Sequence, residues 1–207
     1  MTETGKPRVA IIDYGIGNLR SVEKAFQAGG AEAVVSADER VLRGAEKLVL
    51  PGVGAFRACM EALAARGFDR LVRERVESGT PLLGVCVGMQ MLFEESEEFG
   101  TTSGLGFLPG RVRRFPEGPR VPQVGWNQVG WKNEHPLREG IGEGAFFYFV
   151  HSFYCEAGDA AAVLGETEYG VSYPSVVARG NVCGVQFHPE KSQAEGLRLL
   201  KNFASSV

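Results

Sequence analysis

Short apolar runs alternate with amphipathic segments along the first half of the chain. The apolar runs are rich in Val, Ile and Leu, a pattern typical of buried strands. They cover Arg8–Ile12, Ala33–Val35, Lys47–Leu50 and Pro81–Val85. The segments between them carry apolar residues at helical spacing, which predicts helices over Asn18–Gln27, Phe56–Ala65, Phe68–Ser78 and from the last of these strands through Phe93. Strands that alternate with helices predict a parallel sheet covered on both faces.

The second half of the chain has a different pattern. Apolar and polar positions alternate in several segments, separated by Gly, Pro and Asn, and this predicts strands that pair antiparallel. The predicted strands are Gly106–Val112, Val121–Val129, Ala145–Cys155, Ala162–Glu168, Ser175–Val182 and Cys183–His188, and a closing helix covers Ala194–Phe203. Residues 1–207 are therefore expected to form a single α/β domain. Its central sheet is mostly parallel and flanked by helices, with antiparallel strands added in the second half.

The charge balance argues against several classes of function. The 207 residues include 22 Lys and Arg and 25 Asp and Glu, so the formal net charge is −3 and no basic surface for nucleic acid is indicated. No apolar run approaches the ~20 residues of a membrane span. Met1–Arg8 also lacks the apolar core of a secretory signal. We therefore expect a cytoplasmic protein that binds neither nucleic acid nor membranes.

The four cysteines form no C-x-x-C pair and lie in no cluster with zinc-ligand spacing, so no metal site and no cofactor is expected. A disulfide framework is not expected in a chain of this length without a secretory signal. Each cysteine is interpreted first as a small buried apolar residue. Only Cys86 has a sequence context that suggests chemistry; the others are Cys59, Cys155 and Cys183.

Cys86 lies at the centre of a motif with the form of a nucleophile elbow. The segment Gly84-Val-Cys-Val-Gly88 joins a predicted buried strand to a predicted helix. In such a turn the nucleophile takes a strained backbone conformation, and glycines on either side relieve crowding. The helix that follows directs backbone N–H groups and the positive end of its dipole at the sulfur, which favours the thiolate. On this pattern alone, a buried structural cysteine is an equal alternative.

The tripeptide His188-Pro-Glu190 follows the last apolar strand. Side chains at i and i+2 of an extended segment point to the same face, and Pro189 disfavours a helical conformation at His188. An imidazole and a carboxylate therefore lie side by side where parallel strands end, which is where ligands bind in open α/β sheets. There His188 would take the thiol proton of Cys86 while Glu190 orients the ring. Taken alone, the tripeptide is more often a surface turn.

Two further segments suggest roles around Cys86. Leu50-Pro-Gly-Val-Gly54 follows a neighbouring strand, and its glycines allow a backbone N–H to face a developing oxyanion, with the N–H of Val87 as a second donor. Gln90 lies four residues after Cys86, on the same face of a helix, so its amide can hold the polar end of a substrate. For the glycine turn alone, an ordinary strand-to-helix turn is favoured.

The two remaining histidines are not expected to act as bases. His135 lies in a polar loop and is expected to be solvated. His151 lies in an aromatic strand and is interpreted as a core or rim residue.

The combination of these motifs is more specific than any one of them. The chain resembles the triad-type (class I) glutamine amidotransferases, and within that family it is most similar to the glutaminase subunits of imidazole glycerol phosphate synthases. The resemblance runs from about Arg8 to Phe203. The segments that carry it are Ile11-Ile-Asp-Tyr-Gly-Ile-Gly-Asn-Leu19, Leu50-Pro-Gly-Val-Gly-Ala-Phe56, Gly84-Val-Cys-Val-Gly-Met-Gln90, Val121-Pro-Gln-Val-Gly-Trp-Asn127, Phe147-Tyr-Phe-Val-His-Ser-Phe153 and Val185-Gln-Phe-His-Pro-Glu-Lys-Ser192.

The resemblance implies a role for each candidate residue. Cys86 would attack the carboxamide of glutamine, His188 would carry the proton to the departing ammonia, and Glu190 would orient His188. Water would then hydrolyse the γ-glutamyl thioester. The implied oxyanion residues are Gly52, Val53 and Val87, and the implied substrate-binding residues are Gln90, Ser152 and Phe153.

The resemblance also implies a partner. A (β/α)8-barrel cyclase subunit would receive the ammonia and make imidazole glycerol phosphate and an aminoimidazole carboxamide ribotide, as a heterodimer with this chain. We expect the partner to dock over the face bearing Cys86, with Pro51–Val53, Gln123 and the Asp13–Asn18 loop at its rim.

Other functions remain open at this point. A glutaminase subunit of pyridoxal-phosphate synthase would keep the chemistry, but its oxyanion turn typically has Pro-Gly-Gly-Glu-Ser where this chain has Pro51-Gly-Val-Gly-Ala55. A cysteine hydrolase of related α/β fold would have no use for His188 paired with Glu190. A non-catalytic binding module would most naturally have lost Cys86, His188 or Glu190.

Overall fold

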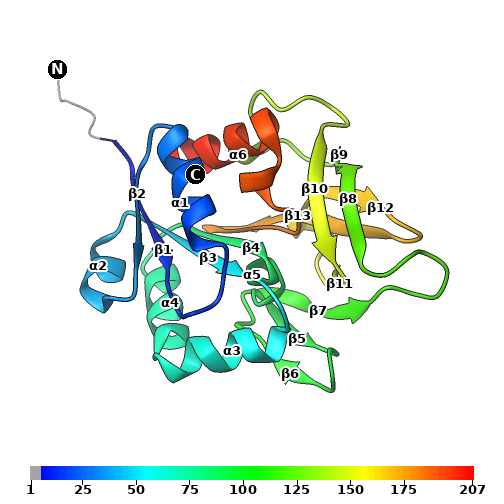
Figure 1. Ribbon diagram of the computed structural model, residues 1–207, viewed down its shortest axis with the longest axis horizontal. Coiled ribbons are helices and arrows are strands. Elements are labelled where there is room, and N and C mark those ends of the chain that lie inside the picture. The colour runs from blue at the N-terminus through cyan, green and yellow to red at the C-terminus, as the bar shows by residue number, and fades with distance from the viewer. Residues whose placement is uncertain (1–5) are drawn as a thin grey trace.

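The central sheet is the middle layer of the computed structural model, which describes residues 6–207 (Figure 1). In spatial order it contains β2 (Glu32–Ser36), β1 (Arg8–Ile12), β3 (Lys47–Gly52), β4 (Leu82–Cys86), β14 (Val182–Val185), β13 (Ser172–Arg179), β12 (Val163–Glu168) and β9 (Gly130–Trp131). The first five are parallel to one another, and the last three pair antiparallel. This confirms the predicted α/β class with antiparallel strands added late in the chain.

Helices cover both faces of this sheet (Figure 1). α1 (Leu19–Ala28) and α6 (Gln193–Ser206) pack together on one face, where the rings of Phe26 and Phe203 meet edge to face with centroids 6.3 Å apart. The other face carries α2 (Glu39–Gly44), α3 (Phe56–Ala65) and α4 (Phe68–Glu77). Because helices lie on both sides, every residue of β4 is buried, as expected of a central parallel strand.

Two smaller sheets lie beside the central one. The first pairs β8 (Gln123–Gln128) antiparallel with β10 (Phe146–His151). The second contains β11 (Phe153–Ala157), β7 (Leu108–Arg114), β5 (Phe93–Ser96) and β6 (Thr102–Ser103). Short 3-10 turns η1 to η3 cover Pro136–Arg138, Ala160–Ala162 and Pro189–Lys191.

The helix predicted to run from β4 through Phe93 is wrong in length. α5 covers only Val87–Gln90, and the chain then enters β5. The backbone N–H groups of Leu105 and Phe107 donate to the carbonyl oxygens of Met91 and Leu92, at 2.7 and 2.9 Å. A loop distant in sequence thus takes the acceptors that a longer helix would have used.

Other strand predictions need smaller corrections. The predicted strand Ala145–Cys155 is two strands, β10 and β11, which belong to different sheets and meet at Ser152. The predicted strand Ser175–Val182 crosses a turn at Gly180, whose φ of 58° favours glycine, so Val182 already belongs to β14. β3 extends past Leu50 to Gly52. The short helix α2, which begins after its N-cap Asp38, was not predicted because of its helical residues only Leu42 is buried.

Two sequence-based expectations concern absent features. Over residues 6–207, no helix combines the length and apolar character needed to cross a membrane. The same part of the chain holds no group of three or more His, Cys, Asp or Glu placed to bind a metal ion. The interpretation of Met1–Arg8 rests mainly on residues 1–5, which lie outside the described residues.

Close backbone packing between β3 and α5 predicts a strong effect of one substitution. A Cβ on Gly88 would overlap the carbonyl oxygen of Leu50. We expect Gly88→Ala to lower the free energy of unfolding by at least about 3 kcal/mol, because backbone on both sides must shift. Gly142→Ala is the matched control, since a Cβ there meets nothing within 4 Å. Urea unfolding checks both variants, and equal stability of the two would contradict this packing.

Candidate active site

Cys86 occupies the sharp turn between β4 and α5. Its φ of 57° and ψ of −115° lie in a region that residues with a Cβ rarely adopt, and such a conformation costs about 1–3 kcal/mol. The flanking glycines allow it, because a Cβ on Gly84 would stand 2.6 Å from the carbonyl oxygen of Gly88. The turn therefore has the geometry predicted for a nucleophile elbow.

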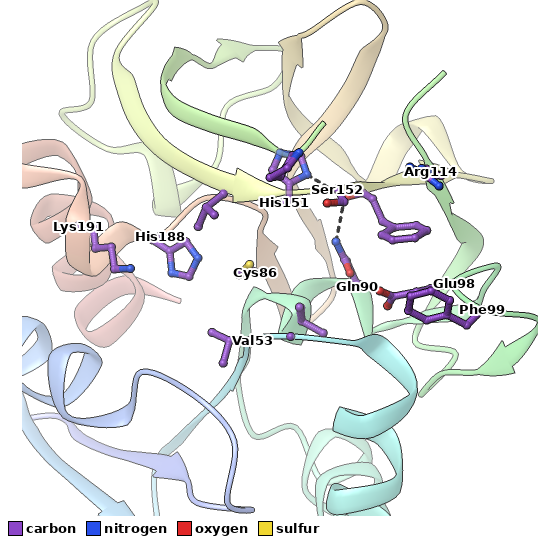
Figure 2. A pocket seen from close by; sticks show the side chains of 15 residues that line it. Val53, Cys86, Gln90, Glu98, Phe99, Arg114, His151, Ser152, His188 and Lys191 are labelled. Atoms are coloured by element: carbon purple, nitrogen blue, oxygen red, sulfur yellow. Dashed lines mark hydrogen bonds between the residues drawn. The ribbon is translucent and has the colours of Figure 1, made fainter. Parts of the chain in front are cut away.

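His188 faces Cys86 from the end of β14 (Figure 2). Its backbone N–H donates to the Tyr148 carbonyl at 2.9 Å, which fixes the segment after the strand. The ring Nδ1 lies 2.9 Å from Oε1 of Glu190, as predicted from their spacing. Since an ionised carboxylate only accepts, Nδ1 carries the proton of this bond and Nε2 is left for the side of Cys86. Asn18, to which sequence reasoning gave no role at the site, donates its Nδ2 to the same Glu190 oxygen at 3.1 Å.

The electrostatics of this pair favour its charged form. Burial lowers the pKa of His188, but hydrogen bonding to Cys86 and Glu190 and their charges outweigh burial and raise the pKa to about 10. Burial raises the pKa of Glu190, but the hydrogen bond and charge of His188 offset it, and the net shift is downward. The Glu190 side chain is fully buried, and His188 and Asn18 both bond to its Oε1 in place of water. Its other oxygen, Oε2, is buried without a hydrogen-bond partner among the described residues.

The glycine turn lies directly beside the elbow. Gly52 pairs with Cys86 in the β3–β4 ladder, and a Cβ on Gly52 would stand 2.7 Å from the backbone nitrogen of Gly88. Two side chains that sequence reasoning missed hold the carbonyls on either side of Gly52. The Tyr14 hydroxyl donates to the Pro51 oxygen at 2.6 Å, and Sγ of Cys59 donates to the Val53 oxygen at 3.4 Å.

The opposite wall of the site is built around Gln90. Its Nε2 donates to the Phe153 carbonyl at 3.0 Å and to Oε1 of Gln186 at 3.1 Å. Gln186 in turn places its own Nε2 3.9 Å from the Cys86 sulfur. Gln186 was not predicted, although it lies two residues before His188 and so shares its direction on an extended segment.

These elements enclose a cavity of about 610 Å³, within the size range of small-molecule sites (Figure 2). The predicted residues on its wall are Val53, Cys86, Val87, Gln90, Ser152, Phe153 and His188. Gly52 and Glu190 are not on this wall: Gly52 is buried, and Glu190 is reached through His188. The wall also carries three charged residues that sequence reasoning missed, Glu98, Arg114 and Lys191.

The structure agrees with the prediction for one of the other two histidines, His151, and differs from it for His135. His151 is buried, as predicted, with Nδ1 2.8 Å from the Phe153 carbonyl and Nε2 3.2 Å from the Tyr173 hydroxyl. The prediction that His135 is solvated is wrong. It is half-buried, and its Nδ1 accepts the backbone N–H of Leu137 at 3.1 Å, which caps η1.

Comparison with known proteins agrees with this geometry. The sequence model of the class-I glutamine amidotransferase family matches residues 10–207, so the chain belongs to the class-I glutamine amidotransferases. A crystal structure described as a glutamine amidotransferase has 26% sequence identity and a TM-score of 0.75, covering 94% of this chain and 96% of that one. The structure of PurLQS from Thermotoga maritima, 22% identical with a TM-score of 0.77, covers 96% of this chain and 97% of that one and shows the same fold.

Relatives with about 50% sequence identity indicate the group within this family to which the chain is most similar. A protein of Geobacter metallireducens named imidazole glycerol phosphate synthase subunit HisH is 50% identical over 205 residues, which cover 96% of this chain and 98% of the relative. A protein of Salinibacter ruber with the same name is 52% identical over 202 residues, covering 94% and 93%. The fold, the elbow and these relatives therefore agree on one family.

The His188–Glu190 pair predicts a defined dependence of stability on pH. Folding raises the pKa of His188 from 6.5 to about 10, so its contribution is full below pH 6.5 and is lost as pH rises towards 10. Folding lowers the pKa of Glu190 from 4.5, so its contribution is present above pH 4.5 and is lost as pH falls. Between pH 4.5 and pH 6.5, where both contributions are present, we expect the free energy of unfolding of the wild-type chain to exceed that of Glu190→Gln by about 2 kcal/mol. Urea unfolding over pH 4 to 10 measures this, and a difference that grows above pH 6.5 would contradict it.

Proposed function

We propose that the chain hydrolyses glutamine to glutamate and ammonia through a γ-glutamyl thioester on Cys86. The observation that carries this proposal is the strained Cys86 turn, which faces His188 across one cavity, while His188 is bonded to Glu190. Membership of the class-I glutamine amidotransferases supports the substrate. A pyridoxal-phosphate-synthase glutaminase is disfavoured, because the curated relatives at about 50% identity carry another name.

In this reaction His188, whose pKa of about 10 keeps the ring charged at neutral pH, holds the proton given up by the Cys86 thiol. The Cys86 thiolate then attacks the side-chain carbonyl carbon of glutamine. The charged form of the pair is favoured by Glu190, which accepts from Nδ1. His188 then returns the proton to the leaving ammonia, and water releases glutamate from the thioester. Backbone N–H groups at Val87 and in the Gly52–Val53 turn are the proposed donors to the oxyanion.

The charged groups on the cavity wall suit the amino-acid end of glutamine. The α-ammonium group needs an acceptor, and Glu98 supplies a carboxylate there, with Oε2 also accepting the N–H of Phe56 at 2.7 Å. On the opposite side the backbone N–H groups at Ser152 and Phe153 are the proposed donors, and Gln90 contributes its Oε1, since its Nε2 already donates to Phe153 and Gln186. A site with both an anion and hydrogen-bond donors selects an amino acid over a simple amide.

Ammonia released into water at neutral pH becomes ammonium, which is not a nucleophile, so the product must pass directly to a partner. We propose that the partner is a (β/α)8-barrel cyclase subunit that makes imidazole glycerol phosphate and an aminoimidazole carboxamide ribotide. The names of the relatives, which describe a subunit of imidazole glycerol phosphate synthase, support this proposal.

The outer face of the β8–β10 sheet is the proposed docking surface. Its exposed apolar residues are Val124, Trp126, Phe146 and Val150. Val150 also lines the cavity, so the apolar surface continues to the mouth of the site. Gln123, expected at the rim of the docking face that bears Cys86, is only 3% exposed and is therefore not part of a docking surface.

Replacing Cys86 should abolish glutamine hydrolysis and leave ammonia-dependent synthesis by the complex intact. We expect Cys86→Ala to lower glutamine hydrolysis at least about 1,000-fold, as removal of a catalytic nucleophile does. The complex should still make product when ammonia is supplied directly. Cys183→Ala is the control, because Cys183 is equally buried but lies away from the cavity. Glutamate release measured for both variants decides the assignment, and a Cys86→Ala variant that hydrolyses glutamine would falsify it.

A charge on the docking surface should weaken the complex. We expect Val124→Glu to raise the Kd for the cyclase subunit at least about tenfold, because a carboxylate would be buried without a partner. Val34→Glu is the control, since Val34 is another exposed strand valine, on edge strand β2. Sedimentation of the mixed subunits measures both, and unchanged binding of Val124→Glu would exclude this surface.

A further inference from the structure

A chain of buried hydrogen bonds connects the cavity to strand β8, and the proposed reaction does not use it. Nδ1 of His151 lies 2.8 Å from the Phe153 carbonyl, and Nε2 lies 3.2 Å from the Tyr173 hydroxyl. The Tyr173 hydroxyl donates to the side-chain oxygen Oε1 of Gln123 at 2.9 Å as the amide is oriented in the structure. Each of these three side chains is buried.

The acceptor at one end of this series of hydrogen bonds determines which group donates in each of them. A carbonyl only accepts, so Nδ1 of His151 must carry a proton. Burial lowers the pKa of His151 to about 4, so the ring is neutral at pH 7 and Nε2 has a free lone pair. The Tyr173 hydroxyl then donates to Nε2. A hydroxyl donates only one proton, so this order requires the Gln123 amide to be turned over, with its N–H group rather than Oε1 towards the Tyr173 oxygen. The two orientations of an amide are alike in shape, so the exchange needs no movement of other atoms.

This arrangement fixes the peptide at the bend of the cavity wall. The Phe153 carbonyl accepts both Nδ1–H of His151 and Nε2–H of Gln90, which uses both of its lone pairs. The bend lies at Ser152, where the chain leaves β10 and enters β11. The rings of Phe115 and Phe149 pack around His151 with centroids 5.2 and 5.7 Å away, so the imidazole has little freedom to turn.

We propose that His151 is a positioning residue, whose Nδ1–H holds the Ser152–Phe153 bend in the orientation that binds the amino-acid end of glutamine. The inference rests on the proposed function for its substrate. It assigns to His151 no contact with the reacting atoms. Tyr173 and Gln123 hold the ring in the required tautomer.

A pair of substitutions tests the role of the donor. The side-chain amide of Asn places its Nδ2 where His carries Nδ1, whereas Leu fills similar space without a donor. We expect His151→Leu to raise the KM for glutamine about tenfold with kcat changed less than about twofold, as loss of one buried hydrogen bond predicts. His151→Asn should restore the KM to within about threefold of the wild-type value. Equal KM values for Leu and Asn, or a loss confined to kcat, would overturn the proposal.

A second pair of substitutions tests the support of the ring. Tyr173→Phe removes the hydroxyl that faces Nε2, and we expect the KM to rise about threefold with little change in kcat. Tyr169→Phe is the matched control, because the ring of Tyr169 packs on Phe115 as that of Tyr173 does. The Tyr169 hydroxyl donates to the Arg120 carbonyl and does not belong to the hydrogen bonds that join His151 to Gln123. Equal KM values for these two variants would contradict the proposed support.

The tautomer of His151 can be measured without activity. The sequence has three histidines, so nitrogen NMR of protein labelled at histidine resolves each ring, and His151→Asn identifies the signals of residue 151. We expect the proton on Nδ1 at pH 7. A proton on Nε2 alone would overturn the inference whether or not the chain hydrolyses glutamine. A wild-type chain that gives no glutamate with its partner would instead count against the proposed function.

Discussion

The site depends on backbone segments that approach more closely than side chains would allow. β3, the end of β4 and the start of α5 meet at Gly52, Gly84 and Gly88, and a Cβ at each would overlap backbone of a neighbouring segment. This close contact holds Cys86 in a conformation with positive φ that costs free energy by itself. The strain is tolerated because the surrounding sheet is buried on both faces and cannot relax locally. The sulfur is therefore placed at the edge of the sheet by the fold and needs no rearrangement of its own.

Burial then shapes the chemistry around that sulfur. His188 and Glu190 are removed from water, and the Nδ1–Oε1 bond compensates part of the solvation that each loses, while Oε2 of Glu190 stays unbonded among the described residues. The neighbouring His151 experiences the same burial without a carboxylate, and its pKa falls to about 4. Two imidazoles near one cavity are thus held in different protonation states, one suited to proton transfer and the other to holding backbone.

Features that depend on a single short segment of sequence could be predicted. The strands β1 to β4, the Gly84–Gly88 elbow and the His188–Glu190 pair follow from local patterns and from the rule that parallel strands end at one edge. Contacts between distant segments could not be predicted. Asn18 reaches Glu190 from 172 positions away, and the helix after Cys86 stops because the loop at Leu105 takes its carbonyl acceptors. Such partners are set by tertiary packing, and periodicity carries no signal for them.

The central claim is that Cys86 alone among the cysteines is activated towards the carboxamide of glutamine. Incubation with a glutamine analogue that carries an electrophile in place of the carboxamide, followed by mass spectrometry of the digested chain, tests it directly. The account predicts one label, on Cys86, that excess glutamine prevents and that His188→Asn slows. Labelling of Cys59, Cys155 or Cys183 at a similar rate, or labelling of Cys86 that glutamine does not prevent, would contradict the claim.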